Sequence, residues 1–225
     1  MSIAAIEEIL ARRVPGRDPR RPPTRRGPAV LSPQAEAELW RERALKRHER
    51  LAPEAFADAR LGADCPRQVR GWVDGHIAGS LGDRCSLMLS GRVGRGKTHL
   101  AYGALRAVAE AGCRDAAWAG GTVAQVFTRL RPNSGEHRAA VLRELTTVPI
   151  LLLDDLGSVK DSEWTEEAIL DLIDARVSRL APMIVTTNAT PKELRAAIGD
   201  RALSRLAGMC AQFEFPANAV DRRLP

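Results

Sequence analysis

Aromatic and cysteine residues are scarce in this 225-residue chain. Aromatic residues make up 4% of it, and its four cysteines lie far apart in sequence, at positions 65, 85, 113 and 210. This spacing fits neither a zinc site nor a disulfide framework, so we predict buried thiols in a reducing cytoplasm. No apolar run reaches the roughly 18 residues that a membrane span needs. The apolar N-terminal stretch contains two glutamates, which argues against a secretory signal.

Lysine is also rare, with 4 lysines against 30 arginines, and the positive charge is unevenly distributed. Residues 1–50 hold 12 basic and 7 acidic residues, whereas the remaining residues hold 22 and 21. The net charge of +6 therefore lies mainly in the N-terminal part. A basic segment binds nucleic-acid phosphates in some proteins and is a solvated tail in others, and the sequence leaves both interpretations open.

Composition divides the chain at about residue 53. Residues 12–26 are rich in Arg, Pro and Gly, which predicts a flexible linker between a short helix over residues 3–10 and a charged helix over residues 33–51. We interpret residues 1–52 as a basic, partly flexible region. Its charged helix is either a solvated face or a partner-binding element. Residues 53–225 have a globular pattern and form the second predicted domain.

Short apolar runs alternate with helical patterns in this second domain. Apolar residues at helical spacing predict helices over residues 97–111 and 164–180. Strands are predicted over residues 86–89, 116–119, 149–153, 183–187 and 212–215. Strands that alternate with helices imply an α/β fold, in which a parallel sheet is covered by helices on both faces.

A glycine-rich segment, GRVGRGKT, lies between the first predicted strand and the following helix and fits the pattern G-x-x-x-x-G-K-S/T. Glycines let the backbone wrap around phosphate oxygens, and the helix presents its positive end to them. Lys97 would reach the β- and γ-phosphates, and the Thr98 hydroxyl would coordinate Mg²⁺. His99 either touches the nucleotide or is an ordinary helix-face residue. The predicted ATP-binding residues are Gly91, Arg92, Val93, Gly94, Arg95, Gly96, Lys97, Thr98 and His99.

Two further strands end in polar side chains. The strand over residues 149–153 is followed by Asp154 and Asp155, at the end of a parallel strand where ligands bind. Asp154 would hold Mg²⁺ through water, and Asp155 would orient or deprotonate the attacking water. The strand over residues 183–187 is followed by Asn188, which either holds that water against the γ-phosphate or caps the turn and helix that follow.

Paired arginines occur near the C-terminus. Arg201 and Arg205 lie four residues apart on one helical face. An arginine inserted into a neighbouring subunit's site would stabilise the charge on a transferring phosphoryl group. Arg222 and Arg223 could meet the nucleotide within the same subunit. Because the chain has 30 arginines, exposed solvated pairs are the alternative interpretation.

The segments GRVGRGKTHLA, ILLLDDLG, IVTTN and DRALSRL occur in an order and spacing similar to those of a known family. Over roughly residues 53–225 the chain resembles the AAA+ ATPases of the DnaC/DnaI helicase-loader type, which are close to the transposition helper IstB. The resemblance implies a P-loop NTPase fold of the AAA+ type. It also implies that the protein uses ATP and Mg²⁺ and hydrolyses ATP.

The resemblance also assigns roles to single residues. It makes Asp155 the catalytic carboxylate and Asn188 the sensor asparagine. Arg205 matches the finger that acts on a neighbouring subunit, with Arg201 in reserve, and Arg223 matches the second sensor arginine.

Three features depart from the family pattern. Arg95 stands where a small hydroxyl residue is common, and Asp155 stands where many ATPases have glutamate. The shorter carboxylate predicts slow hydrolysis. The N-terminal region lacks the cysteine clusters of some loaders, so its helicase-binding role is inferred from position alone.

The leading hypothesis is a cytoplasmic protein of DNA replication that loads the replicative helicase onto single-stranded DNA. By resemblance, residues 1–52 would bind the helicase, and the ATPase domain would self-associate in an ATP-dependent oligomer and contact single-stranded DNA through Arg129 and Arg131. One alternative is an IstB-like ATPase helper of a DNA transposase, which would bind duplex DNA. Another is an adaptor that binds ATP without hydrolysing it. A small-molecule kinase is disfavoured because no acceptor-pocket motif is visible.

Overall fold

The computed structural model describes residues 32–131, 135, 137–158, 163–216 and 218. The helix and linker expected within residues 3–26 lie outside this part of the chain. The helices are α2 (Pro33–Leu51), the 3-10 helix η1 (Glu54–Phe56), α3 (Arg67–Ile77), α4 (Lys97–Glu110), α5 (Val123–Leu130), α6 (Arg138–Thr147), α7 (Glu163–Val177) and α8 (Pro191–Met209). The strands are β1 (Ser86–Ser90), β2 (Trp118–Thr122), β3 (Ile150–Asp154), β4 (Met183–Thr187) and β5 (Cys210–Glu214).

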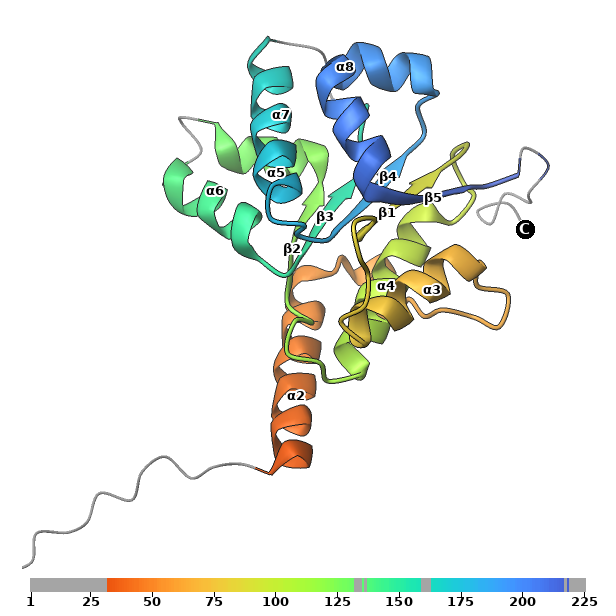
Figure 1. Cartoon of the computed structure of the whole chain (residues 1–225), viewed down its shortest axis with the longest axis vertical. Coiled ribbons are helices and arrows are strands. Elements are labelled where there is room, and N and C mark those ends of the chain that lie inside the picture. Colours follow the sequence, from red (N-terminus) through yellow and green to blue (C-terminus); the bar gives the residue numbers. More distant parts are fainter. Residues whose placement is uncertain (1–31, 132–134, 136, 159–162, 217, 219–225) are drawn as a thin grey trace, which may run out of the picture. The chain divides into compact units, whose positions relative to one another are not determined.

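The strands found in the described residues form one five-stranded sheet in the order β2-β3-β4-β1-β5. Every neighbouring pair is parallel. Helices α5, α6, α7 and α8 lie on one side of the sheet, and α2, α3 and α4 lie on the other (Figure 1). The predicted α/β fold with helices on both faces is confirmed.

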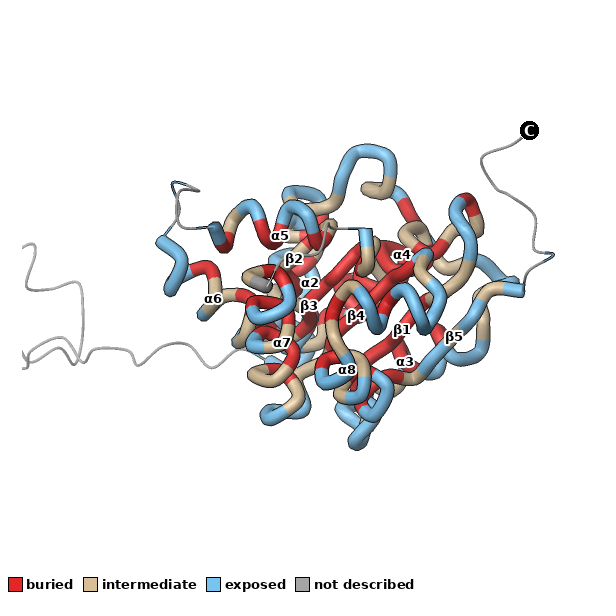
Figure 2. Tube along the Cα trace, turned by 90° about the horizontal axis from the view of Figure 1, so that it is seen from above, coloured by how far each residue is buried: buried red, intermediate tan, exposed pale blue. Residues whose placement is uncertain are grey.

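The core consists of two apolar layers, one on each face of the sheet, because side chains of a strand alternate between its faces. On β3, Leu151 and Leu153 pack with α5 to α8, whereas Ile150 and Leu152 pack with α2 to α4. Figure 2 shows that the buried residues follow the strands and the inner sides of the helices. Within the described residues, no helix has the length and apolar character needed to cross a membrane.

Strand β2 begins two residues and ends three residues further along the chain than the sequence predicted. Two glycines follow residue 119, and glycine weakens strands. In the structure Gly120 has φ +112° and pairs with Leu152, and a Cβ there would lie 2.0 Å from the Leu152 carbonyl oxygen. Glycine is therefore required at this position by the close approach of β3.

Helix α7 ends three residues before the predicted end at residue 180. Leu180, which the apolar pattern placed on the buried face, is 51% exposed and has φ +48°. The remaining predicted strands and helices overlap the observed ones. The four cysteines are free, and burial raises the pKa of Cys210 to about 12.

Helix α2 packs against the rest of the domain, although its sequence offers few apolar anchors. Its buried residues are Ala44 and His48, and the His48 ring lies 5.9 Å from the ring of Trp118 and 6.4 Å from that of Tyr102. Burial lowers the pKa of His48, which favours its neutral form in this contact. Within the described residues, α2 belongs to the same compact unit as the sheet and its helices.

Arg176 of α7 is a fully buried arginine that ties three elements together. Its guanidinium donates hydrogen bonds to the carbonyl oxygens of Leu145 and Val148 at 3.2 and 2.5 Å, to that of Pro149 at 3.2 Å and to that of Pro182. Burial lowers its pKa to about 10, so it is still charged at neutral pH. These bonds hold the chain at the starts of β3 and β4.

Two N-terminal deletions are expected to differ in stability. Deletion of residues 1–32 keeps α2, whereas deletion of residues 1–50 removes His48 and exposes the rings of Tyr102 and Trp118. The longer deletion should therefore lower the free energy of unfolding by at least about 2 kcal/mol relative to the shorter one, since one large side chain contributes about that much on burial. Urea denaturation followed by circular dichroism measures the difference. Equal stability of the two proteins would show that α2 does not belong to the folded core.

Candidate functional site

The glycine-rich loop connects the end of β1 to the start of α4. Gly91, Gly94 and Gly96 have φ values of +136°, +82° and +90°, a backbone region that residues other than glycine rarely adopt. At Gly91 a Cβ would also lie 2.9 Å from the Cβ of Phe215, whose N–H donates to the Ser90 carbonyl oxygen. The loop therefore needs glycine both for its backbone conformation and for the approach of the chain that follows β5.

Lys97 lies within the turn of this loop and is only 6% exposed. Its Nζ donates to the carbonyl oxygens of Gly91 at 2.7 Å and of Arg92 at 2.8 Å. The loop thus holds a nearly buried ammonium group at the N-terminus of α4, where the helix also carries a partial positive charge. This arrangement suits the binding of phosphate.

Asp154 ends β3 and is hydrogen-bonded to residues of two other elements. Its Oδ1 accepts from the Thr98 hydroxyl at 3.0 Å and from the Thr186 hydroxyl at 2.6 Å. Burial raises the pKa of Asp154, and the hydrogen bonds from the two threonines act in the opposite direction. A carboxylate beside a hydroxyl offers the oxygen ligands that Mg²⁺ prefers, so Asp154 and Thr98 fit the predicted metal site.

Asp155 and Asn188 meet at the ends of β3 and β4. Asn188 Nδ2 donates to Asp155 Oδ1 at 2.6 Å, and the Asp155 N–H donates to the Thr186 hydroxyl oxygen at 2.9 Å. Asp155 has φ +60°, a left-handed conformation that aspartate tolerates better than most residues. The backbone turn and the asparagine together fix where this carboxylate lies.

The capping role that was the alternative for Asn188 belongs to another residue. Thr190 is the N-cap of α8, and its hydroxyl oxygen accepts from the Glu193 N–H at 3.3 Å. The Glu193 carboxylate accepts in return from the Thr190 N–H at 2.8 Å, which completes a capping box. Asn188 is therefore directed to Asp155 and not to the helix.

One cavity of about 610 Å³ brings most of the predicted site residues together. Its lining also includes Phe56 of η1 and Thr122 of β2, which no sequence motif indicated. Two predicted nucleotide-binding residues, Gly91 and Arg92, line a neighbouring cavity of about 680 Å³ below α8 instead. Arg95 is half-buried and lines neither cavity. The lining residues predicted from the sequence are Val93, Gly94, Gly96, Lys97, Thr98, His99, Asp154, Asp155 and Asn188.

None of Arg129, Arg131, Arg201 and Arg205 lines this cavity. Arg205 of α8 is paired through its Nε with Asp174 Oδ1 of α7 at 2.6 Å. Arg201 is exposed, also on α8. Arg129, at the end of α5, pairs with Glu144 of α6 at 2.8 Å. Of the remaining predicted arginines, Arg131 is exposed, and Arg222 and Arg223 lie outside the described residues.

Comparisons with known proteins agree with this geometry. The model of a family described as IstB-like ATP binding protein matches residues 78–209, more than half of the chain. The replicative helicase loader DnaC of Escherichia coli (strain K12) is 28% identical over 148 residues, which are 62% of this chain and 54% of that protein. The chain thus spans about half the length of this curated relative.

Two solved structures share the fold. The crystal structure of the DnaC helicase loader has a TM-score of 0.62 and 24% identity and covers 73% of this chain and 100% of that one. The structure of DnaI has a TM-score of 0.62 and 20% identity, with coverage of 72% and 94%. These similarities establish the P-loop fold of the AAA+ type. The chain belongs to the family of IstB-like ATP binding proteins.

Proposed function

We propose that this protein binds and hydrolyses ATP with Mg²⁺, and that it loads a replicative helicase onto single-stranded DNA. One observation carries the enzymatic part. The Lys97 ammonium group, the Asp154 carboxylate and the Asp155 carboxylate, which accepts a hydrogen bond from Asn188, line the same cavity. The loading part is supported by the similarity to DnaC, a protein named as a replicative helicase loader.

Each site residue would have a distinct task in hydrolysis. Lys97 would exchange the two loop carbonyl oxygens for phosphate oxygens, and Thr98 and Asp154 would hold Mg²⁺. The metal ion would neutralise charge on the phosphates. Asn188 occupies Oδ1 of Asp155, and Oδ2 would orient the attacking water or take its proton.

The site would be completed by an arginine from a neighbouring subunit in an ATP-dependent oligomer. Among the described residues that line the cavity, Lys97 is the only lysine or arginine. Arg205 is partly exposed on α8, and its pairing with Asp174 holds the guanidinium at the surface. We retain Arg205 as the proposed finger, Arg201 as its reserve and Arg223 as the second sensor.

The proposed helicase-binding region remains residues 1–52, with α2 contributing only its exposed side. Arg129 and Arg131 remain proposed contacts for DNA, although Glu144 already neutralises Arg129. A second candidate function, the helper of a DNA transposase, is favoured by the IstB-like family match.

Capture of the host's replicative helicase should distinguish the two functions. A loader bound to ATP should retain the helicase on an affinity column, and the helicase should be lost after deletion of residues 1–50. A helper of a transposase should instead retain the transposase and prefer duplex over single-stranded DNA. If the protein retains the helicase neither with nor without ATP, helicase loading is contradicted and the ATPase proposal is left intact.

Replacement of Asp155 by asparagine should abolish hydrolysis while ATP binding stays within about twofold of the wild type. The amide keeps the shape of the side chain but cannot take a proton, and loss of a general base costs about 100-fold or more. Phosphate release and a fluorescent ATP analogue measure the two effects. Asp171→Asn, on the exposed side of α7, is the control. Unchanged turnover in Asp155→Asn would remove this residue from catalysis.

Mixing two inactive variants should restore part of the activity. Lys97→Ala lacks the phosphate-binding lysine but keeps Arg205, and Arg205→Ala lacks the finger but keeps an intact cavity. A mixed interface can combine a complete cavity with a complete finger, and such a finger contributes about 1,000-fold or more to the rate. ATP turnover of the mixture, measured against each variant alone, is the test. A mixture that assembles but stays inactive would mean that Arg205 is not shared between subunits.

A further inference from the structure

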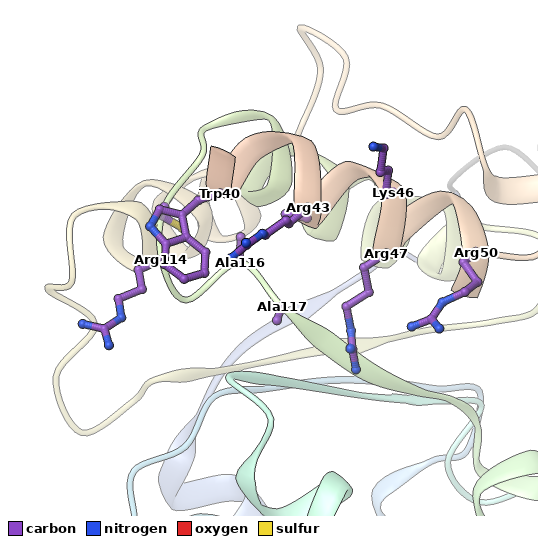
Figure 3. A pocket seen from close by; sticks show the side chains of 10 residues that line it. Trp40, Arg43, Lys46, Arg47, Arg50, Arg114, Ala116 and Ala117 are labelled. Atoms are coloured by element: carbon purple, nitrogen blue, oxygen red, sulfur yellow. The ribbon is translucent and has the colours of Figure 1, made fainter. Parts of the chain in front are cut away.

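A basic groove lies between α2 and the segment that leads from α4 into β2 (Figure 3). It has a volume of about 460 Å³. Four arginines line it, Arg43, Arg47 and Arg50 from α2 and Arg114 from the segment before β2, and no aspartate or glutamate does so among the described residues. The ATP cavity lies at the other ends of α4 and β2, so the groove is a separate feature.

Three of these arginines lack a carboxylate partner in the described part of the chain. Arg43, Arg50 and Arg114 are exposed, and the described residues provide no ion pair for them. Arg47 already has partners within the chain. Its Nε donates to the Trp118 carbonyl oxygen at 2.6 Å, and its Nη2 lies 3.4 Å from the Glu144 carboxylate. Lys46 also lines the groove, but it is already paired with Glu42 at 2.5 Å. Like charges that line one groove repel one another, and a bound anion would relieve that repulsion.

The groove also offers surfaces that suit a planar base. Trp40 lies at one end of the groove, with the guanidinium carbon of Arg43 at 5.5 Å from the ring centroid. Ala116 and Ala117 line the groove opposite α2 and leave an apolar floor. Bases stack on aromatic rings beside arginine in proteins that bind single strands, whereas an acidic peptide has no use for the half-buried indole ring of Trp40.

We propose that this groove binds a single strand of nucleic acid, with phosphates on Arg43, Arg50 and Arg114 and a base stacked on Trp40. Arg43 and Arg50 are seven residues apart, about 10 Å along the helix, a distance that a short stretch of single strand spans. A duplex keeps its bases stacked inside and presents no face to the indole ring. The inference rests on the proposed function and adds a DNA contact near Arg129, because Arg129 and Arg47 of the groove share the Glu144 carboxylate.

The test compares two triple variants that lose the same charge. Arg43→Gln/Arg50→Gln/Arg114→Gln removes the groove's exposed cations, and Arg67→Gln/Arg84→Gln/Arg179→Gln removes three exposed arginines elsewhere. Binding of a fluorescein-labelled oligothymidylate of 20 nucleotides is measured by anisotropy at several salt concentrations. The groove variant should lose about tenfold or more in affinity. The slope of log K against log salt concentration should become shallower by about 2, because each of three lost phosphate contacts contributes about 0.7. The control variant should stay within about threefold of the wild type.

Replacing Trp40 by alanine separates stacking from charge. It should weaken oligothymidylate binding about fivefold or more, as the loss of one stacked base does, while the salt slope stays unchanged. Affinity for a fluorescent ATP analogue should be unaffected in all three variants, because the ATP cavity lies apart from these residues. A Trp40→Ala protein that binds oligothymidylate like the wild type would overturn the stacking contact.

The remaining outcomes decide between the groove and other sites. Equal losses in the two triple variants, or a groove variant that binds like the wild type, would overturn the inference and leave the proposed loader function standing. A glutamate-rich peptide whose binding depends on the groove, with oligothymidylate binding unaffected, would overturn it in favour of a protein partner. If the wild-type protein itself binds no oligothymidylate, the single-strand part of the proposed function fails together with the groove.

Discussion

The parallel pairing of β3, β4 and β1 is the constraint on which the candidate site depends. Parallel strands end at the same edge of a sheet, so Asp154, Thr186 and the loop after β1 meet there although they are far apart in sequence. The Thr186 hydroxyl links the strands directly, because it donates to the Asp154 carboxylate and accepts from the Asp155 N–H. A shift of one residue in the register would turn these side chains to the opposite face.

Polar contacts stabilise the opposite edge of the same sheet. Arg176 satisfies carbonyl oxygens that precede β3 and β4, and Arg47 does the same for the Trp118 carbonyl on β2. A buried cation is costly unless it is well hydrogen-bonded, and four carbonyl oxygens supply bonds to Arg176. Helix α2 adds the packing of His48 against two aromatic rings. The strand starts are thus fixed by charged and aromatic groups, and the strand ends remain open for a ligand.

The sequence predicts the site better than it predicts the fold's irregular parts. Lys97, Thr98, Asp154 and Asp155 follow from local patterns, because the chemistry needs those residue types directly after apolar strands. The position of β2 could not be predicted in the same way, because Gly120 is required by the approach of β3, which is distant in sequence. Phe56 also escaped prediction, since only folding brings η1 beside the glycine-rich loop.

The packing of α2 escaped prediction for a different reason. Its sequence is mostly charged, and a helix of this kind usually lies in solvent. It docks through the buried Ala44 and His48, the partly buried Leu45 and Leu51, and Arg47, which donates to a strand carbonyl oxygen. The same helix leaves a row of arginines exposed, and that row makes the groove basic.

Asp154 and Thr98 are the proposed holders of the metal that accompanies ATP. Calorimetric titration of ATP with Mg²⁺ and with a chelator, in the wild type and in Asp154→Asn, tests this most directly. The wild type should bind ATP more tightly with Mg²⁺ by about tenfold, which corresponds to about 1.4 kcal/mol. Asp154→Asn, which keeps the side chain's shape, should bind ATP equally with and without Mg²⁺. An undiminished effect of Mg²⁺ in Asp154→Asn would contradict the assignment of this site.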